Sequence, residues 1–208
     1  CVSDTKAYSR VFMGLTRAIR RDGATAAVVR SHLAGLQSVT DAWPSDEQFT
    51  EAWMTGHAYS ALNNGRIVYI LSKLSETYRN SKTEQLKVTG QLTVEHLMPQ
   101  AWVAHWLLSD GSRGINNPWS VPADDPQALA TRARSAIVQT FGNLTLITGS
   151  LNSAISNGAW ATKRAAIEAN SLLPINLQLR SAETWDEVAI ERRGRDLLCR
   201  ALKLWPRG

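Results

Sequence analysis

Residues 1–88 carry apolar side chains at the spacing of amphipathic helices. Residues three or four positions apart share one face of a helix, so each repeat of this kind predicts a helix. One stripe consists of Val11, Phe12, Leu15, Ala18 and Ile19. Another, after the break at Asn63-Asn64-Gly65, consists of Ile67, Ile70, Leu71, Leu74 and Tyr78. No catalytic pattern accompanies these stripes, so we expect a helical scaffold or connector.

Local signals mark where further helices begin. The run Ser45-Asp46-Glu47-Gln48 has the form of a capping box, and Thr184-Trp185-Asp186-Glu187 has the same form. Pro126 is preceded by an aspartate, and proline is favoured at the first position of a helix. We expect the helix from Pro126 to end near Thr140 and the last helix to end near Leu204.

The pattern changes from helical to alternating at residues 92–94. These residues are β-prone, and they predict a short strand that runs into Glu95 and His96 and is ended by Pro99. A second short strand is predicted at residues 144–147. Since nothing else in the chain alternates in this way, we expect a mainly α protein with a small β-hairpin.

The predicted elements suggest three parts. They are a helical scaffold at residues 1–88, a core with both strands at 89–170, and a basic C-terminal helix at 171–208 that packs on the core. The residues of the last helix expected to pack inward are Leu197, Leu198, Ala201 and Leu202. Its other face is expected to carry Arg192, Arg193, Arg195, Arg200 and Lys203.

The composition excludes several classes of protein. The 208-residue chain is 44% hydrophobic with a net charge of +5, which suits a globular domain and mildly favours polyanionic partners. It lacks a run of about 18 apolar residues, so no membrane is expected. Cys1 and Cys199 form no CxxC pair, which argues against structural zinc and favours a reducing, cytoplasmic setting. Because the chain does not open with Met, we expect a fragment of a longer protein.

Three polar blocks stand out against the apolar pattern. Glu95-His96-Leu97-Met98-Pro99-Gln100 includes the end of the first strand, Gly142-Asn143-Leu144-Thr145-Leu146 opens the second, and Asn152 follows it. A histidine can deprotonate water, and a carboxylate with a carboxamide oxygen can hold a hard cation against a phosphate. These groups, in this order, are those that a one-metal nuclease uses.

The blocks resemble the HNH (His-Me finger) nucleases, and more closely the C-terminal nuclease domain of GmrSD-type, modification-dependent restriction and phage-defence proteins. That family has a similar Glu-His-Ile-Leu-Pro-Gln run, a Gly-Asn-Leu-Thr-Leu run and a later Asn followed by Lys, which here is Lys163. Met98 departs from the usual Leu or Val. The resemblance implies a ββα-metal core embedded in a helical domain, a bacterial cytoplasmic setting, and a preceding nucleotide-using sensor domain as partner.

The resemblance also implies a role for each polar residue. His96 would be the general base, mostly neutral at working pH because the ordinary pKa of histidine is about 6.5. Glu95 and Asn152 would hold Mg²⁺, for which Mn²⁺ should substitute. Neighbours on a regular strand point to opposite faces, so a local twist or bulge is expected to let Glu95 and His96 reach one phosphate. Asn143 would join the catalytic set by pinning the loop that carries His96.

Simpler roles stay open for these residues. His96 could be a hydrogen-bonded histidine at a strand end, Glu95 could form a surface salt bridge, and Asn152 could be a helix N-cap. The candidate contacts to the DNA backbone, with a solvated helix face as the alternative, are Lys163, Arg164, Arg192 and Arg195.

The function expected from these roles is Mg²⁺-dependent hydrolysis of a DNA phosphodiester. His96 would take a proton from water, and the cation would stabilise the negative charge that develops on the phosphate. One site cuts one strand per event, so nicking is the expected outcome. Two other classes stay open: a catalytically silent DNA-binding module and a helical protein-interaction adaptor.

Overall fold

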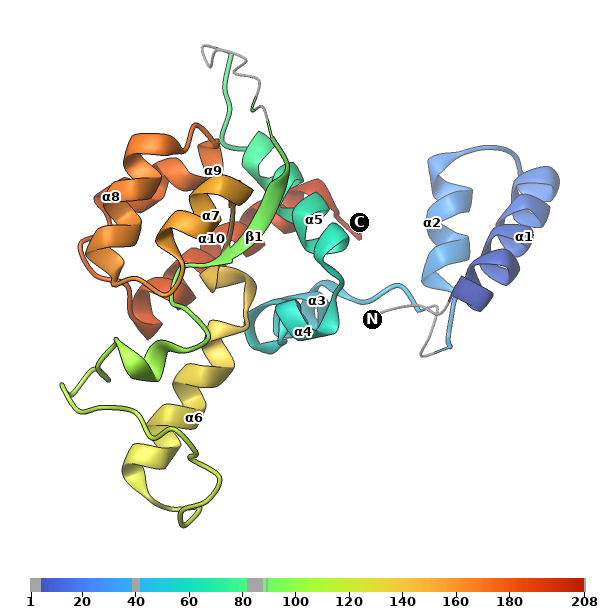
Figure 1. Ribbon diagram of the computed structural model, residues 1–208. Helices are drawn as coiled ribbons and strands as arrows, with labels where there is room; N and C mark the ends of the chain where they lie inside the picture. The colour runs from blue at the N-terminus through green and yellow to red at the C-terminus, as the bar shows by residue number, and fades with distance from the viewer. Residues whose placement is uncertain (1–4, 39–41, 82–87, 89, 208) are drawn as a thin grey trace. The chain divides into compact units, whose positions relative to one another are not determined.

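The computed structural model describes residues 5–38, 42–81, 88 and 90–207 (Figure 1). The chain forms two compact units, one of Trp53–Ala201 and one of Cys1–Ala52 with Leu202–Gly208. The described residues form helices and a two-stranded antiparallel sheet, so the expected mainly helical protein with a small hairpin is confirmed. No helix within those ranges is long and apolar enough to cross a membrane. The division at residues 88 and 170 stays a prediction.

A helical hairpin opens the chain. α1 (Thr5–Asp22) and α2 (Ala26–Ala34) are joined through Gly23, whose φ of 94° is a conformation that favours glycine. The Thr25 hydroxyl caps α2 by accepting a hydrogen bond from Val28 N at 3.2 Å. Residues 11–19, which carry the expected apolar stripe, all lie on α1, as their spacing predicts.

Three helices follow, namely α3 (Asp46–Thr55), α4 (Ala58–Ala61) and α5 (Asn64–Glu76). The predicted capping box before α3 is confirmed, because Ser45 N donates to Gln48 Oε1 at 2.9 Å and Gln48 N donates to Ser45 Oγ at 3.2 Å. Asn63 caps α5 by accepting from Arg66 N at 2.9 Å. The asparagine-rich break in the pattern is thus a helix start.

The sheet is regular where the candidate site lies. β1 (Leu92–His96) and β2 (Leu144–Thr148) pair antiparallel in a register that matches Glu95 with Thr145 and continues unbroken to His96. The bulge expected at this point is therefore wrong, and the alternative of a local twist stays a prediction. A regular register turns the side chains of Glu95 and His96 to opposite faces of the sheet.

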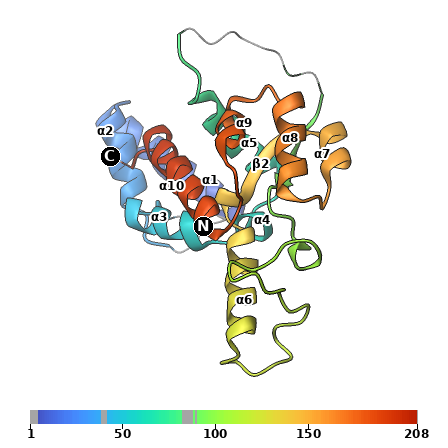
Figure 2. The same ribbon diagram turned by 90° about the vertical axis from the view of Figure 1, so that its left-hand side faces the viewer.

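Helices cover the sheet on both sides, as Figures 1 and 2 show. α5 lies on one side, and its Ile67, Leu71 and Leu74 are fully buried. The helices on the other side, or at the β2 edge, are α7 (Gly149–Ile155), α8 (Trp160–Asn170) and α9 (Pro174–Leu177). The helix α7 follows β2 directly, so the order strand, strand, helix is present.

The segment between the strands forms a lobe with α6 (Pro126–Val138), which extends away from the sheet in both views. Proline stands at the predicted first position of α6, and Asp125 Oδ1 accepts from Ala128 N at 2.7 Å. Short 3₁₀ turns occur at Trp102–Ala104, Phe141–Asn143 and Gln178–Ser181. The turn at Trp102–Ala104 precedes α6, so the segment between β1 and α6 is only partly irregular.

The last helix, α10 (Glu187–Leu204), differs in part from its prediction. Asp186 caps it by accepting from Ala189 N at 2.9 Å, so the N-cap expected at Thr184 is wrong. Arg193, expected on the exposed face, is buried with 4% of its surface exposed. The helix keeps the expected end, and Leu197, Leu198 and Ala201 are buried as expected, whereas Leu202 is partly exposed.

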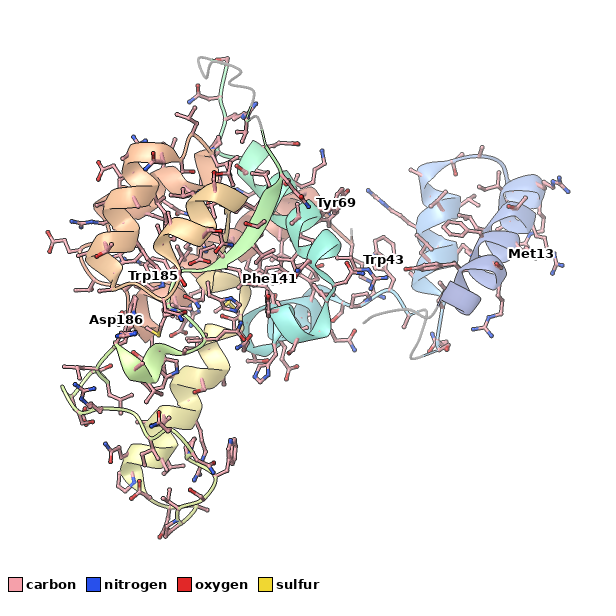
Figure 3. All side chains as sticks on the ribbon, viewed as in Figure 1. Met13, Trp43, Tyr69, Phe141, Trp185 and Asp186 are labelled. Carbon is pink, nitrogen blue, oxygen red and sulfur yellow. The ribbon has the colours of Figure 1, made fainter. Side chains whose placement is uncertain are left out.

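Stacked aromatic rings fill the core of the Trp53–Ala201 unit. Phe141 lies on Trp53 with ring centroids 4.1 Å apart, and Trp185 lies on Trp160 with centroids 4.8 Å apart. Figure 3 shows Phe141 and Trp185 inside this unit. These stacks join Trp53, α8 and the turn before β2 within the core of this unit.

Candidate functional site

His96 is buried at the end of β1. Only 7% of the residue is exposed, and the Tyr59 ring meets the imidazole edge-on with centroids 4.4 Å apart. Its Nε2 atom is buried and has no hydrogen-bond partner in the described part of the chain. A buried polar atom without a partner is uncommon, and it marks a place where a ligand or a water can bind.

The surroundings of His96 keep its imidazole neutral. The pKa of His96 is lowered to about 4, mainly by burial, with a smaller contribution from the nearby charge of Lys163, while the interaction with the Gln139 side chain opposes the shift. At neutral pH the ring is therefore uncharged. A neutral imidazole can accept a proton, which is the state that a general base requires.

Asn143 is fully buried and holds the loop that follows His96. Its Oδ1 accepts from Met98 N at 2.8 Å and from Trp185 Nε1 at 3.0 Å. Its Nδ2 donates to Met98 O at 2.8 Å and to Val138 O at 2.9 Å. A carboxamide has two donors and two acceptor positions, and here all are used. The side chain is thus bonded as a structural pin, with no hydrogen-bonding capacity left for a substrate.

The turn that presents Asn143 requires a glycine before it. A Cβ at Gly142 would lie 2.2 Å from the Ile190 carbonyl oxygen of α10, so only glycine allows this approach. Arg193 then binds the turn, since its Nη1 donates to Gly142 O at 2.8 Å and to Leu144 O at 2.7 Å. The last helix therefore fixes the backbone on both sides of Asn143.

Glu95 and Lys163 form a buried ion pair on the opposite face of β1. Lys163 Nζ lies 2.5 Å from Glu95 Oε1 and donates to His96 O at 2.7 Å. The lysine side chain is 0% exposed, although a contact with DNA or a solvated face was expected. Burial raises the pKa of Glu95 and lowers that of Lys163, and their direct bond opposes both shifts.

Asn152 lies on the same face of β1 as Glu95. It is within α7, where Thr148 holds the N-cap position, so the alternative of a helix N-cap is wrong. Its Nδ2 donates to Thr93 Oγ1 at 3.0 Å and approaches Val94 O at 3.4 Å. Its Oδ1 has no partner among the described residues, and the side chain is partly exposed.

For a divalent cation, Asn152 fits and Glu95 does not. The Asn152 oxygen is a free, neutral, hard donor, which suits a Mg²⁺ ion that keeps several of its waters. The Glu95 carboxylate is buried and already bonded to an ammonium group. Among the described residues, no group of three His, Cys, Asp or Glu side chains could hold a metal ion.

The remaining candidates for DNA contact do not gather at His96. Arg164 donates to Ala182 O at 3.1 Å and is partly buried. Arg192 is exposed on α10, and Arg195 is exposed there with its guanidinium 2.5 Å from Glu191. The structure thus brings together Glu95, His96, Asn143 and Lys163, places Asn152 of α7 against β1, and leaves the arginines apart.

Sequence reasoning missed several residues that shape this site. Tyr59 and Gln139 contact His96, Trp185 holds Asn143, and Arg193 holds the turn. Trp185 stands in the second capping-box pattern, and Arg193 stands among exposed arginines, so neither carries a local signal of burial.

The fold is a helical domain around a two-stranded sheet. Its candidate site contains a buried, neutral histidine at a strand end, which is the state of a general base. The chain matches the GmrSD restriction endonucleases, C-terminal domain, over residues 43–199, and it belongs to that family. The expected resemblance is confirmed, and the function is of the restriction-endonuclease type, a nuclease with DNA as its substrate. Comparisons with curated proteins and with solved structures found no match.

Proposed function

We propose that this domain hydrolyses DNA phosphodiester bonds with His96 as the general base. The observation that carries the proposal is the Nε2 atom of His96, buried and without a partner among the described residues, on a ring kept neutral by burial. Asn143 supports this role because it fixes the backbone two residues beyond the base.

In the proposed reaction His96 Nε2 takes one proton from a water molecule. The water oxygen then bonds to phosphorus, and the bond from phosphorus to the 3′ oxygen breaks. The leaving oxygen takes a proton from solvent. Since Nε2 is covered, the groups packed over it, Tyr59 among them, must move to admit water and substrate.

A divalent cation is part of the proposal, with Asn152 as its side-chain ligand and Mg²⁺ or Mn²⁺ as the ion. When bound, it supplies positive charge for the phosphate and the leaving oxygen. Asn152 is suited to this role by its free Oδ1, held in place through the bond from Nδ2 to Thr93. It lies on the face of β1 opposite the His96 ring, so a phosphate that reaches both must lie across the end of the strand. Glu95, the other ligand expected from the sequence, would have to leave Lys163 to take part.

The wider role rests on family analogy. We propose that the domain nicks DNA as the effector of a modification-dependent restriction or phage-defence protein in the bacterial cytoplasm. Its partner would be a nucleotide-using sensor domain of the same protein. Arg164, Arg192 and Arg195 stay candidates for contacts to the DNA backbone, because two of them are exposed and all are cationic.

Conversion of supercoiled plasmid to open circles tests the proposal. The wild type with Mg²⁺ or Mn²⁺ should nick, and both His96→Ala and excess EDTA should abolish nicking. His105→Ala is the matched control, since His105 is an exposed histidine of the same unit. Equal nicking by the wild type and His96→Ala would show that another group is the base.

A silent DNA-binding module is the second candidate function. The observation in its favour is the Lys163 ammonium on Glu95 Oε1, which places a positive charge directly beside one of the two predicted metal ligands. Titration with Mn²⁺ separates the two functions. A nuclease should bind Mn²⁺ and lose it in Asn152→Ala, whereas a silent module should bind DNA without binding the metal.

A further inference from the structure

We propose that Lys163 and Glu95 act as a positioning pair for His96, and that neither contacts DNA or metal. This inference rests on the proposed role of His96 as the general base. It assigns to Lys163 and Glu95 a part in the reaction that differs from the one their sequence pattern suggests.

One ammonium group joins two neighbouring residues of the strand. Lys163 Nζ bonds the side chain of Glu95 and the backbone carbonyl of His96, at 2.5 and 2.7 Å. The Glu95 side chain and the His96 ring point to opposite faces of β1. Lys163 therefore holds the backbone of the base from the face away from its ring, where it does not obstruct the substrate.

The helix that carries Lys163 is itself anchored next to Asn143. Trp160, at the start of α8, stacks on Trp185 and donates from Nε1 to Ala182 O at 2.9 Å. Trp185 in turn donates to Asn143 Oδ1. Lys163, which bonds His96, and Asn143, which bonds Met98, are thus connected through Trp160 and Trp185. Together they hold the end of β1 and the loop after it.

Burial and charge keep the pair from other partners. The Lys163 side chain is 0% exposed and that of Glu95 is 8% exposed, so a phosphate reaches neither without opening the core. A dication at Glu95 would also sit beside the lysine ammonium, and like charges at such a distance repel. A buried pair with good geometry that also bonds a backbone carbonyl serves to fix structure.

Amide hydrogen exchange and Mn²⁺ binding test the inference without relying on nicking. In Lys163→Met, exchange in the peptide of residues 92–98 should rise about tenfold, while the peptide of α10 stays unchanged, because a local restraint is lost. In Glu95→Gln, the Kd for Mn²⁺ should stay within about twofold of the wild type, since the ion is held elsewhere.

Two further variants guard against trivial outcomes. If Lys163→Met unfolds because Glu95 is left as an unpaired buried charge, the neutral pair Glu95→Gln with Lys163→Met should restore folding and still show fast exchange at residues 92–98. The matched control is Lys73→Met, which breaks the exposed Lys73–Glu76 pair and should change nothing.

Three results would overturn the inference: normal exchange at residues 92–98 in Lys163→Met, normal exchange there in the double variant, or about tenfold weaker Mn²⁺ binding in Glu95→Gln. A wild type that binds no Mn²⁺ agrees with it, since Glu95 then holds no ion. Where the wild type nicks DNA, Lys163→Met should lower kcat about tenfold at constant KM, as expected for a misplaced base. A wild type without nicking counts against the proposed function alone.

Discussion

The two faces of β1 at its carboxyl end differ in how far their polar groups are satisfied. On the face of Glu95, the carboxylate bonds Lys163, and Asn152 bonds Thr93 and has a partly exposed oxygen without a partner among the described residues. On the face of His96, the imidazole packs against the Tyr59 ring and keeps a buried nitrogen without a partner in the described part of the chain. Glu95 and His96 are neighbours on one strand, but the first has a bonded side chain and the second has a nitrogen without a partner.

This difference separates the residues that support the base from the base itself. Saturated hydrogen bonds hold a backbone in one position, while a buried basic atom without a partner is free to react. Because side chains alternate along a strand, both can be built at adjacent positions without interfering. The experiments below weaken one face or the other and ask whether the roles stay separate.

Replacing Asn143 should have the largest effect, since it joins the loop after His96 to the end of α6 and to Trp185. Asn143→Ala leaves four buried partners unbonded, and at about 1 kcal/mol for each it should lower the free energy of unfolding by about 4 kcal/mol. Urea unfolding measures this loss. Asn170→Ala, which removes an exposed bond to Ala166 O, should cost less than about 0.5 kcal/mol.

A loss for Asn143→Ala no greater than that of the Asn170 control would show that the strand end is held by other contacts. Asn143 would then not be needed to hold the loop after His96, and it could not be what positions the base.

The pH dependence of the free energy of unfolding should show that His96 is buried in its neutral form. The folded-state pKa of His96, about 4, lies below the unfolded value of about 6.5. Between these values the unfolded chain binds a proton that the folded chain does not, so stability falls as pH falls. The whole effect corresponds to about 3 kcal/mol between pH 7 and pH 4.

His96→Gln should remove this contribution. The difference in free energy of unfolding between wild type and variant, measured by urea titration at several pH values, should change by about 3 kcal/mol over the same window. Parallel stability curves would mean that the imidazole is not held neutral by burial.

Removing the ring over His96 should have a smaller effect on stability. Tyr59→Ala should cost about 2 kcal/mol, because the residue is half-buried. It should also move the pKa of His96 up toward its ordinary range, which an NMR titration of the ring protons follows. Tyr59→Phe keeps the ring and should behave as the wild type. An unchanged pKa in Tyr59→Ala would assign the covering of Nε2 to other groups.

Local signals in the sequence predicted the elements well. Both strands, the capping box at Ser45 and the helix start at Pro126 lie where the pattern places them, because each depends on residues close in the chain. Glu95, His96 and Asn143 also lie close together as expected, because β1 carries the first two and pairs with β2, which directly follows Asn143.

What the sequence could not predict depends on burial by distant parts of the chain. Lys163 meets Glu95 across 68 positions, and Arg193 meets the turn at Gly142 across 51. A lysine or arginine on a helix is exposed far more often than buried. Only the packing of α8 and α10 shows that these two are internal, which is why both were expected at the surface.

The smallest effect on folding is expected from the arginines that stay exposed on α10. Arg192 and Arg195 lie on either side of buried Arg193 in the sequence. As on β1, nearby residues of one element thus have different surroundings, here exposed and buried. The double variant Arg192→Ala with Arg195→Ala should change the free energy of unfolding by less than about 0.5 kcal/mol. If both contact phosphate, the plot of log Kd for DNA against log salt should become less steep by about 2.

Fluorescence anisotropy with a labelled duplex at several salt concentrations measures that slope. The matched control is Arg17→Ala with Arg20→Ala, two exposed arginines at the same spacing on α1, which removes the same charge. An equal loss of slope in both double variants would mean that net charge alone attracts DNA. A loss confined to the α10 variant would place the phosphate contacts on the exposed side of the helix whose buried side holds the turn before β2.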